Sequence, residues 1–102
     1  MIGEYQGHFK YSKTDITKCD SSDGGVYYLG NINANGKLGV LYVGKAFGKD
    51  GIRGRLLQHL NDNEWPDISH FGFKTCSTEK ESLEFESIEI ERLKPKHNKI
   101  GK

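Results

Sequence analysis

The stretch GVYYLGNINANGKLGVLYVG, residues 25–44, decides the fold of this chain. It contains two runs rich in strand-forming residues, 25–30 and 39–44, and the Asn35-Gly36 pair between them is a strong reversal signal. The two runs therefore predict an antiparallel hairpin with a rather long connection.

The segments after this hairpin predict the rest of an α+β domain. Residues 52–60 carry apolar side chains at helical spacing and predict a helix, whereas residues 70–76 alternate and predict a strand. A second helix is expected to begin after a cap at Ser77 or Thr78 and to stop at Pro95. The resulting β-β-α-β-α order predicts a small three-stranded antiparallel sheet flanked by helices.

The segment before the hairpin, residues 1–24, is a polar N-terminal arm that ends in SSDGG. Within it, residues 8–11 could add a short edge strand. The remainder, residues 25–102, is the size of one small domain. Two cysteines are too few for a disulfide framework, so we expect reduced thiols, although a single bridge stays open. No apolar run approaches ~20 residues and the N-terminus lacks a secretion core, so we expect a cytoplasmic protein without a membrane segment.

One glutamate interrupts an apolar row on the last predicted helix. Leu83, Glu86, Ile90 and Leu93 follow a 3-4-3 spacing, which places them on one helix face. A carboxylate in this row should lie against the core or at its edge, and it should have a cation or a metal beside it because a buried lone charge is costly. The other glutamates of the helix are expected on different faces, where they need no such partner.

Charge along the C-terminal segment is strongly asymmetric. Residues 79–91 contain six glutamates and one lysine, whereas residues 92–102 contain five Lys or Arg and no acid. This order complements the helix dipole. A basic end is also suited to bind phosphates.

Several polar residues fall where strands and helices should bring them together. Tyr27 and Tyr42 lie on the two hairpin strands, and Arg55 and His59 are four residues apart on one helix face. An arginine can grip a phosphate through two donors, and one carboxylate can hold a divalent metal. A tyrosine can relay a proton if nearby cations lower its pKa. Together with Glu86, these groups suit cleavage of a phosphodiester.

Five short motifs, in the right order along nearly the whole chain, resemble those of the GIY-YIG nuclease superfamily. They are Gly25-Val26-Tyr27, Tyr42-Val43-Gly44 with Lys45 after it, Arg55-x-x-x-His59, Glu86, and Pro95-x-x-Asn98 nine residues further on. The resemblance implies a nuclease domain over residues 25–102 that hydrolyses DNA with one divalent ion, Mg²⁺ or Mn²⁺. Products with 5′-phosphate and 3′-hydroxyl ends would be expected.

The resemblance also implies roles for individual residues. Glu86 would bind the metal and Arg55 would contact the scissile phosphate. Tyr27 would act as general base or orient the water, and His59 would take the proton onward. Tyr42 and Lys45 would position and polarise the nucleophile, and Asn98 would support the site. The cations expected to contact nucleic acid are Arg53, Arg55, Lys45, Lys49, Lys96 and Lys99.

Other interpretations stay open on the sequence alone. The chain could be a catalytically inactive nucleic-acid-binding or interaction module of the same fold, or a nuclease directed at RNA or branched DNA. Specificity could come from an attached or separate DNA-binding module. Singly, Gly44 could serve a tight turn, Asn98 could end a helix, and the tyrosines could be ordinary strand residues, as we expect for Tyr28.

Overall fold

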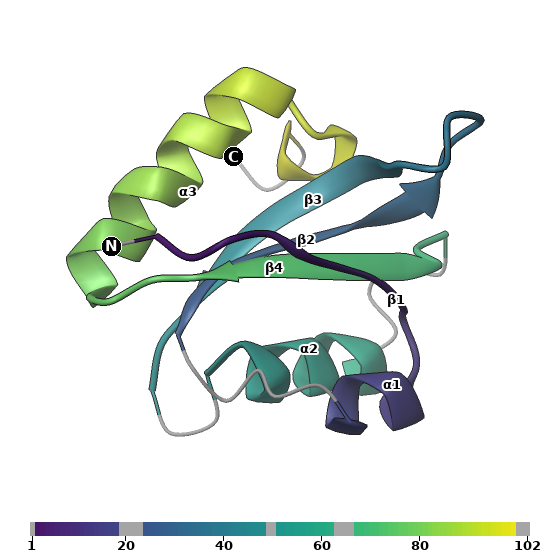
Figure 1. The fold of residues 1–102 in the computed structure, drawn as a ribbon, viewed down its shortest axis with the longest axis horizontal. Helices are drawn as coiled ribbons and strands as arrows, with labels where there is room; N and C mark the ends of the chain where they lie inside the picture. The colour runs from purple at the N-terminus through teal and green to yellow at the C-terminus, as the bar shows by residue number, and fades with distance from the viewer. Residues whose placement is uncertain (1, 19–23, 49–50, 63–66, 100–102) are drawn as a thin grey trace.

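The computed structural model describes residues 2–18, 24–48, 51–62 and 67–99, which form three layers with the sheet in the middle (Figure 1). Helix α3 covers one face of the sheet, and α1 and α2 lie against the other. The elements in chain order are β1 (Gln6–Lys10), α1 (Lys13–Lys18), β2 (Gly25–Ile32), β3 (Leu38–Ala46), α2 (Gly51–Asp62), β4 (His70–Thr75), α3 (Glu79–Leu93) and the 3-10 turn η1 (Lys96–Lys99). None of the helices described here is long and apolar enough to cross a bilayer.

The sheet is fully antiparallel and has the strand order β1-β4-β2-β3. The predicted order strand, strand, helix, strand, helix is present as β2, β3, α2, β4 and α3. The sheet has one strand more than the three predicted, because Gln6–Lys10 of the N-terminal arm pairs with β4. The edge strand considered for residues 8–11 is thus present, although it begins two residues earlier. The hairpin strand β3 is therefore one edge of the sheet, and β1 is the other.

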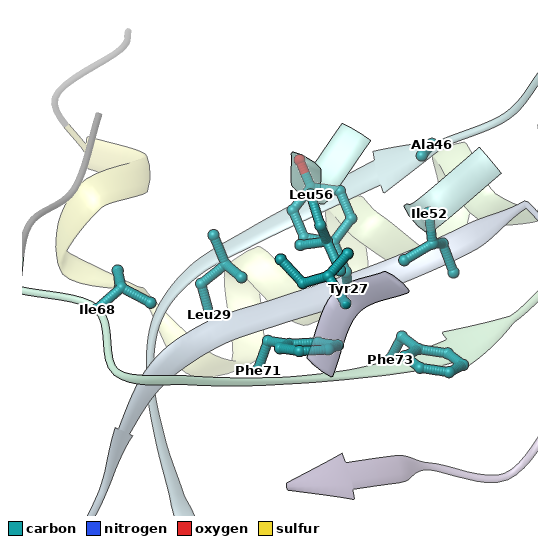
Figure 2. Packing of buried hydrophobic residues seen from close by; sticks show 9 residues of the cluster. Tyr27, Leu29, Ala46, Ile52, Leu56, Ile68, Phe71 and Phe73 are labelled. Carbon is teal, nitrogen blue, oxygen red and sulfur yellow. The ribbon is translucent and has the colours of Figure 1, made fainter. Parts of the chain in front are cut away.

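Strand β2 lies in the centre and sends alternate side chains to two separate cores. Tyr27 and Leu29 belong to the core on the α2 side, whereas Val26 and Tyr28 belong to the core on the α3 side. Because all four are at most 3% exposed, β2 is buried on both faces. Figure 2 shows the α2-side core, in which Ile52 and Leu56 lie close to Tyr27.

The caps of α3 explain where this helix begins and ends. Thr78 is the N-cap, and its side chain accepts a hydrogen bond from the backbone N–H of Glu81, while a Glu81 carboxylate oxygen accepts one from the N–H of Ser77. At the other end Lys94 adopts the left-handed conformation and donates to the carbonyl of Ile90. The predicted cap at Ser77 or Thr78 is thus confirmed at Thr78.

The buried face of α3 differs from the predicted row. Leu83 is 50% exposed, and Glu86 is half-buried at the edge of the face. Ser82 and Glu89, in contrast, are buried against the sheet. The expectation that the other glutamates need no partner is therefore wrong for Glu89, which is only 3% exposed.

Glu89 is held by two partners that satisfy its charge. The Tyr28 hydroxyl donates to Oε1 at 2.7 Å. Arg92 donates to Oε2 through Nε and to Oε1 through Nη2, both at 2.8 Å. The Arg92 hydrogen bonds lower the pKa of the Glu89 carboxyl, burial opposes them, and the Tyr28 hydrogen bond lowers the pKa further. Tyr28 is therefore more than an ordinary strand aromatic, because its hydroxyl donates a hydrogen bond that stabilises a buried carboxylate.

Candidate active site

Three rings from three elements meet on the α2 side of the sheet. The hydroxyl of Tyr27 on β2 lies 2.8 Å from Nε2 of His59 on α2, and the two groups share a hydrogen bond. The ring of Tyr42 on β3 lies 6.1 Å from that of Tyr27 and 6.0 Å from that of His59 between centroids. Tyr27 and His59 are almost fully buried, whereas Tyr42 is half-buried. Tyr42 is therefore the ring of this cluster nearest to solvent.

Gly44 makes this cluster possible. It pairs with Tyr27 across the β2–β3 ladder, so a side chain at position 44 would lie on the same face as the Tyr27 ring. A Cβ there would overlap the phenol end of Tyr27 and Cε2 of Tyr42. Gly44 lies inside β3, so it does not serve a tight turn. Its hydrogen atom leaves the space into which the Tyr27 phenol extends.

Two opposite charges act on the same phenol. Arg55, an exposed residue of α2, lowers the pKa of Tyr27 through a hydrogen bond and through its charge, whereas Glu86 of α3 raises it. Arg55 therefore reaches the Tyr27 hydroxyl, whereas Glu86 belongs to the helix on the opposite face of the sheet and has the smallest of these effects. Arg55 also donates from Nη1 to the side-chain oxygen of Gln58 at 3.1 Å, which restricts the guanidinium.

Burial has the largest effect on the Tyr27 pKa. It raises the pKa far above the ordinary value of a phenol, and the neighbouring phenol of Tyr42 raises it further. Arg55 only partly opposes this increase. The condition stated for a tyrosine relay, a net lowering of the pKa by nearby cations, is therefore not met at Tyr27. Tyr27 is therefore a neutral hydroxyl in the folded protein, and the tautomer of His59 sets which of the two groups donates.

A polar hollow of about 480 Å³ lies beside the ring cluster. Arg55 lines it and also acts on Tyr27, so this side chain joins the hollow to the rings. Lys45 lines the hollow from the edge strand β3. Because side chains alternate along a strand, Lys45 lies on the same side of the sheet as Val43, which is the α3 side. The hollow therefore reaches both sides of that edge. Its lining residues are Lys45, Ala46, Phe47, Gly51, Gly54, Arg55, Gln58 and Glu79.

The Asn98 side chain lies against the edge strand β3 at Val43, between Tyr42 and Gly44. Its side-chain oxygen accepts from the Val43 N–H at 2.8 Å, and its amide nitrogen donates to the Val43 carbonyl at 2.9 Å. The amide thus binds the backbone as a further strand would, and it attaches η1 to β3. In this position Asn98 holds the segment that carries Tyr42 and Gly44.

The other expected cations are less closely grouped. Arg53 is half-buried on α2 and Lys96 is exposed on η1, and neither is among the residues that line the hollow. Lys49 lies outside the described residues, as does the side chain of Lys99.

The donor set allows one mode of metal binding. Within residues 2–18, 24–48, 51–62 and 67–99, no group of three or more His, Cys, Asp or Glu side chains gathers as a metal cage. A metal at Glu86 would therefore be held by a single carboxylate together with water and phosphate oxygens. Mg²⁺ commonly binds in this way, because it keeps several of its waters, so the residues present fit the ion.

Sequence reasoning missed Gln58 and Glu79, which line the hollow, and the steric role of Gly44. Gln58 could have been found, because it follows Arg55 at the i, i+3 spacing of helix neighbours. Glu79 could not, because its proximity to α2 depends on the tertiary fold. Comparison of the chain with family models, curated proteins and solved structures finds no match. The function proposed below therefore rests on the geometry of the cluster and on the motif resemblance.

Proposed function

We propose that this chain is a GIY-YIG-type endonuclease that hydrolyses phosphodiester bonds of duplex or branched DNA with one divalent metal. The observation that carries this proposal is the convergence on one phenol. Tyr27 shares a hydrogen bond with His59, its ring lies tilted beside that of Tyr42, and its pKa responds to the charges of Arg55 and Glu86. Five residues that suit phosphoryl transfer thus come from two strands and two helices, and two cations, Lys45 and Arg55, line the hollow.

In this proposal the positive charges of the hollow bind the substrate phosphate. Lys45 and Arg55 line the hollow, and the fork of an arginine suits two phosphate oxygens. Gln58 holds one Arg55 nitrogen, so less side-chain freedom is lost when the phosphate binds. Arg55 would also stabilise the charge that develops on the oxygens during attack.

The attacking water is placed beside Tyr42, the phenol nearest to solvent. Its oxygen bonds to phosphorus while the bond to the 3′ oxygen breaks, and the leaving oxygen takes a proton from solvent. The water proton passes to the Tyr27 oxygen as the Tyr27 proton passes to Nε2 of His59. This relay keeps Tyr27 neutral throughout, in agreement with its raised pKa, and its second transfer follows the 2.8 Å hydrogen bond to an unprotonated Nε2 of His59.

Glu86 would hold Mg²⁺ or Mn²⁺ through its carboxylate. When bound, such an ion neutralises negative charge at the phosphate and at the leaving oxygen. Asn98 contributes indirectly, because its amide fixes the β3 backbone between Tyr42 and Gly44.

The proposal is tested by cutting of supercoiled plasmid in Mg²⁺ or Mn²⁺ by wild type, Glu86→Gln and Glu84→Gln. Glu84 is a matched control, because it is an exposed glutamate of the same helix and, unlike Glu86, is not among the groups that shift the pKa of Tyr27. Loss of a metal-holding carboxylate should slow cutting by roughly 100-fold or more, whereas Glu84→Gln should cut like wild type. Unfolding curves of all three proteins would establish that they are folded.

Two results would contradict the proposal. Equal rates of cutting by Glu86→Gln and wild type would show that Glu86 is not the metal ligand. No cutting of plasmid, hairpin, flap, single-stranded DNA or RNA by a folded wild type would instead favour an inactive binding module.

A further inference from the structure

Phe47 is an exposed aromatic side chain in the wall of the polar hollow. It directly follows β3 and is 38% exposed, whereas Phe71 and Phe73 in the core are at most 1% exposed. Of the described residues that line the hollow, it alone is aromatic. None of the steps proposed for phosphodiester hydrolysis uses this ring.

The backbone at Gly24 determines how the Phe47 ring lies. A side chain at position 24 would place its Cβ 2.6 Å from Cγ and Cδ2 of the ring and 2.7 Å from Cδ1. Nearly equal distances to three neighbouring ring atoms put that Cβ above the face of the ring rather than beside its edge. The ring therefore lies flat over Gly24, which has no side chain to displace it. The opposite face of the ring points away from this backbone.

The charged groups of the hollow suit one phosphate beside this ring. Lys45 and Arg55 carry two positive charges and Glu79 carries one negative charge, so the excess is a single positive charge. A surface that followed a long stretch of polynucleotide backbone would need several cations. This hollow instead combines a small positive excess with one flat apolar surface. Cations and aromatic rings together are the means by which proteins bind unpaired nucleotides.

Stacking on Phe47 requires a base that is not already covered by its neighbours. Inside a duplex both faces of each base are covered, so a base must be unpaired or turned out of the helix to reach the ring. Forks, flaps and single strands supply such bases without the cost of unpairing. We propose that Phe47 stacks on an unpaired base next to the phosphate bound by Arg55, so that the protein prefers DNA with unpaired bases to intact duplex. The identity of the ligand rests on the proposed nuclease function.

The test is fluorescence anisotropy in EDTA, where metal-dependent cutting is excluded, with three labelled DNA probes. They are a paired duplex, a fork with unpaired thymidine arms, and the same fork with abasic residues in those arms. Wild type should bind the thymidine fork roughly 5- to 100-fold more tightly than the abasic fork, which is the effect of one base stacked on an aromatic ring. It should bind the duplex no more tightly than the abasic fork.

Four variants assign this preference to the ring. Phe47→Leu keeps an apolar side chain but removes the flat ring, so it should bind both forks alike, whereas Phe47→Trp should keep the preference. Arg55→Ala should weaken binding of both forks by a similar factor, because the phosphate is present in each. Ile88 is 59% exposed on α3 and does not line the hollow, so Ile88→Ala should bind every probe like wild type. Urea unfolding of each variant would establish that it is folded.

The inference and the proposed nuclease function can fail separately. Equal affinity of wild type for the two forks, or no binding of either, would overturn the inference, as would a preference that survives in Phe47→Leu. The hydrolytic function is decided instead by metal-dependent cutting and by Glu86→Gln. A folded wild type that prefers the thymidine fork through Phe47 but cuts no substrate would support the base contact and contradict only the hydrolysis.

Discussion

The substitution Glu89→Gln should destabilise the fold although it leaves the size of the side chain unchanged. The Glu89 carboxylate accepts three hydrogen bonds, one from Tyr28 and two from Arg92. A glutamine offers one oxygen, and its NH₂ group would face donors. Hydrogen bonds to charged groups contribute about 1.5–3 kcal/mol each, but the mostly exposed Arg92 would regain water. We therefore expect a loss of about 2–3 kcal/mol in the free energy of unfolding.

Urea unfolding at pH 7 measures this loss, with Glu84→Gln as the control. Because Glu84 is exposed on the same helix, its substitution should change stability by less than ~0.5 kcal/mol. A change in the midpoint without a change in slope would show that the native state has lost stability rather than altered its compactness.

The pH dependence gives a second, sharper test. The pKa of Glu89 is lowered in the folded protein, chiefly by Arg92, so its stabilisation is fully present above the unfolded pKa of about 4.3. It is lost as the pH falls through the folded pKa. The difference between wild type and Glu89→Gln should therefore be constant from pH 7 to about pH 5 and should vanish at still lower pH. A difference below 0.5 kcal/mol at pH 7, or one that persists at pH 2, would refute the reasoning.

Three further substitutions test the active-site cluster and its supports. Tyr27→Phe removes the hydroxyl bonded to His59 and should slow plasmid cutting at least about 100-fold. Its free energy of unfolding in urea should fall by only ~1–2 kcal/mol, and unchanged cutting would exclude the relay. Gly44→Ala should cost about 1–3 kcal/mol in urea, because the methyl group overlaps the Tyr27 phenol, and equal midpoints would contradict this steric role. Asn98→Ala should lower the free energy of unfolding by about 1–2 kcal/mol and accelerate amide hydrogen exchange at Val43. Unaltered exchange at Val43 would show that the two hydrogen bonds from the Asn98 side chain do not hold this backbone.

Much of the fold follows from local signals in the chain. The hairpin, the strand at His70–Thr75 and the cap at Thr78 were predictable, because alternation, turn residues and capping are local properties. Helix α1 was not predicted, because KTDITK contributes a single buried residue, Ile16. Its position depends on packing against α2 and β1.

The face of α3 could not be predicted from its residues alone. Glutamates and apolar residues alternate along this helix, so several rotations about its axis give a plausible apolar stripe. Contact with the sheet selects the rotation that buries Ser82 and Glu89 and exposes Leu83. A polar residue on a buried face gives no hydropathy signal, and Glu89 can be buried because Tyr28 on the facing strand β2 and Arg92 one turn further along α3 both donate to it.

The candidate site was predicted as a set of residues, but its electrostatics were not. Spacing on one helix face indicated Arg55 and His59, and strand position indicated the tyrosines. The near-complete burial of Tyr27, and the consequent increase of its pKa, depend on packing from α2 and β3 that no motif encodes.

The amide of Asn98 also has a consequence for how copies of this chain meet. β3 ends the sheet, and an uncovered terminal strand is a template on which another molecule can add its own backbone. By taking both the N–H and the carbonyl of Val43, the Asn98 side chain interrupts that template at its middle. The 3-10 turn η1 therefore leaves less of this edge available for pairing with a strand of another molecule, on the same strand from which Lys45 lines the hollow.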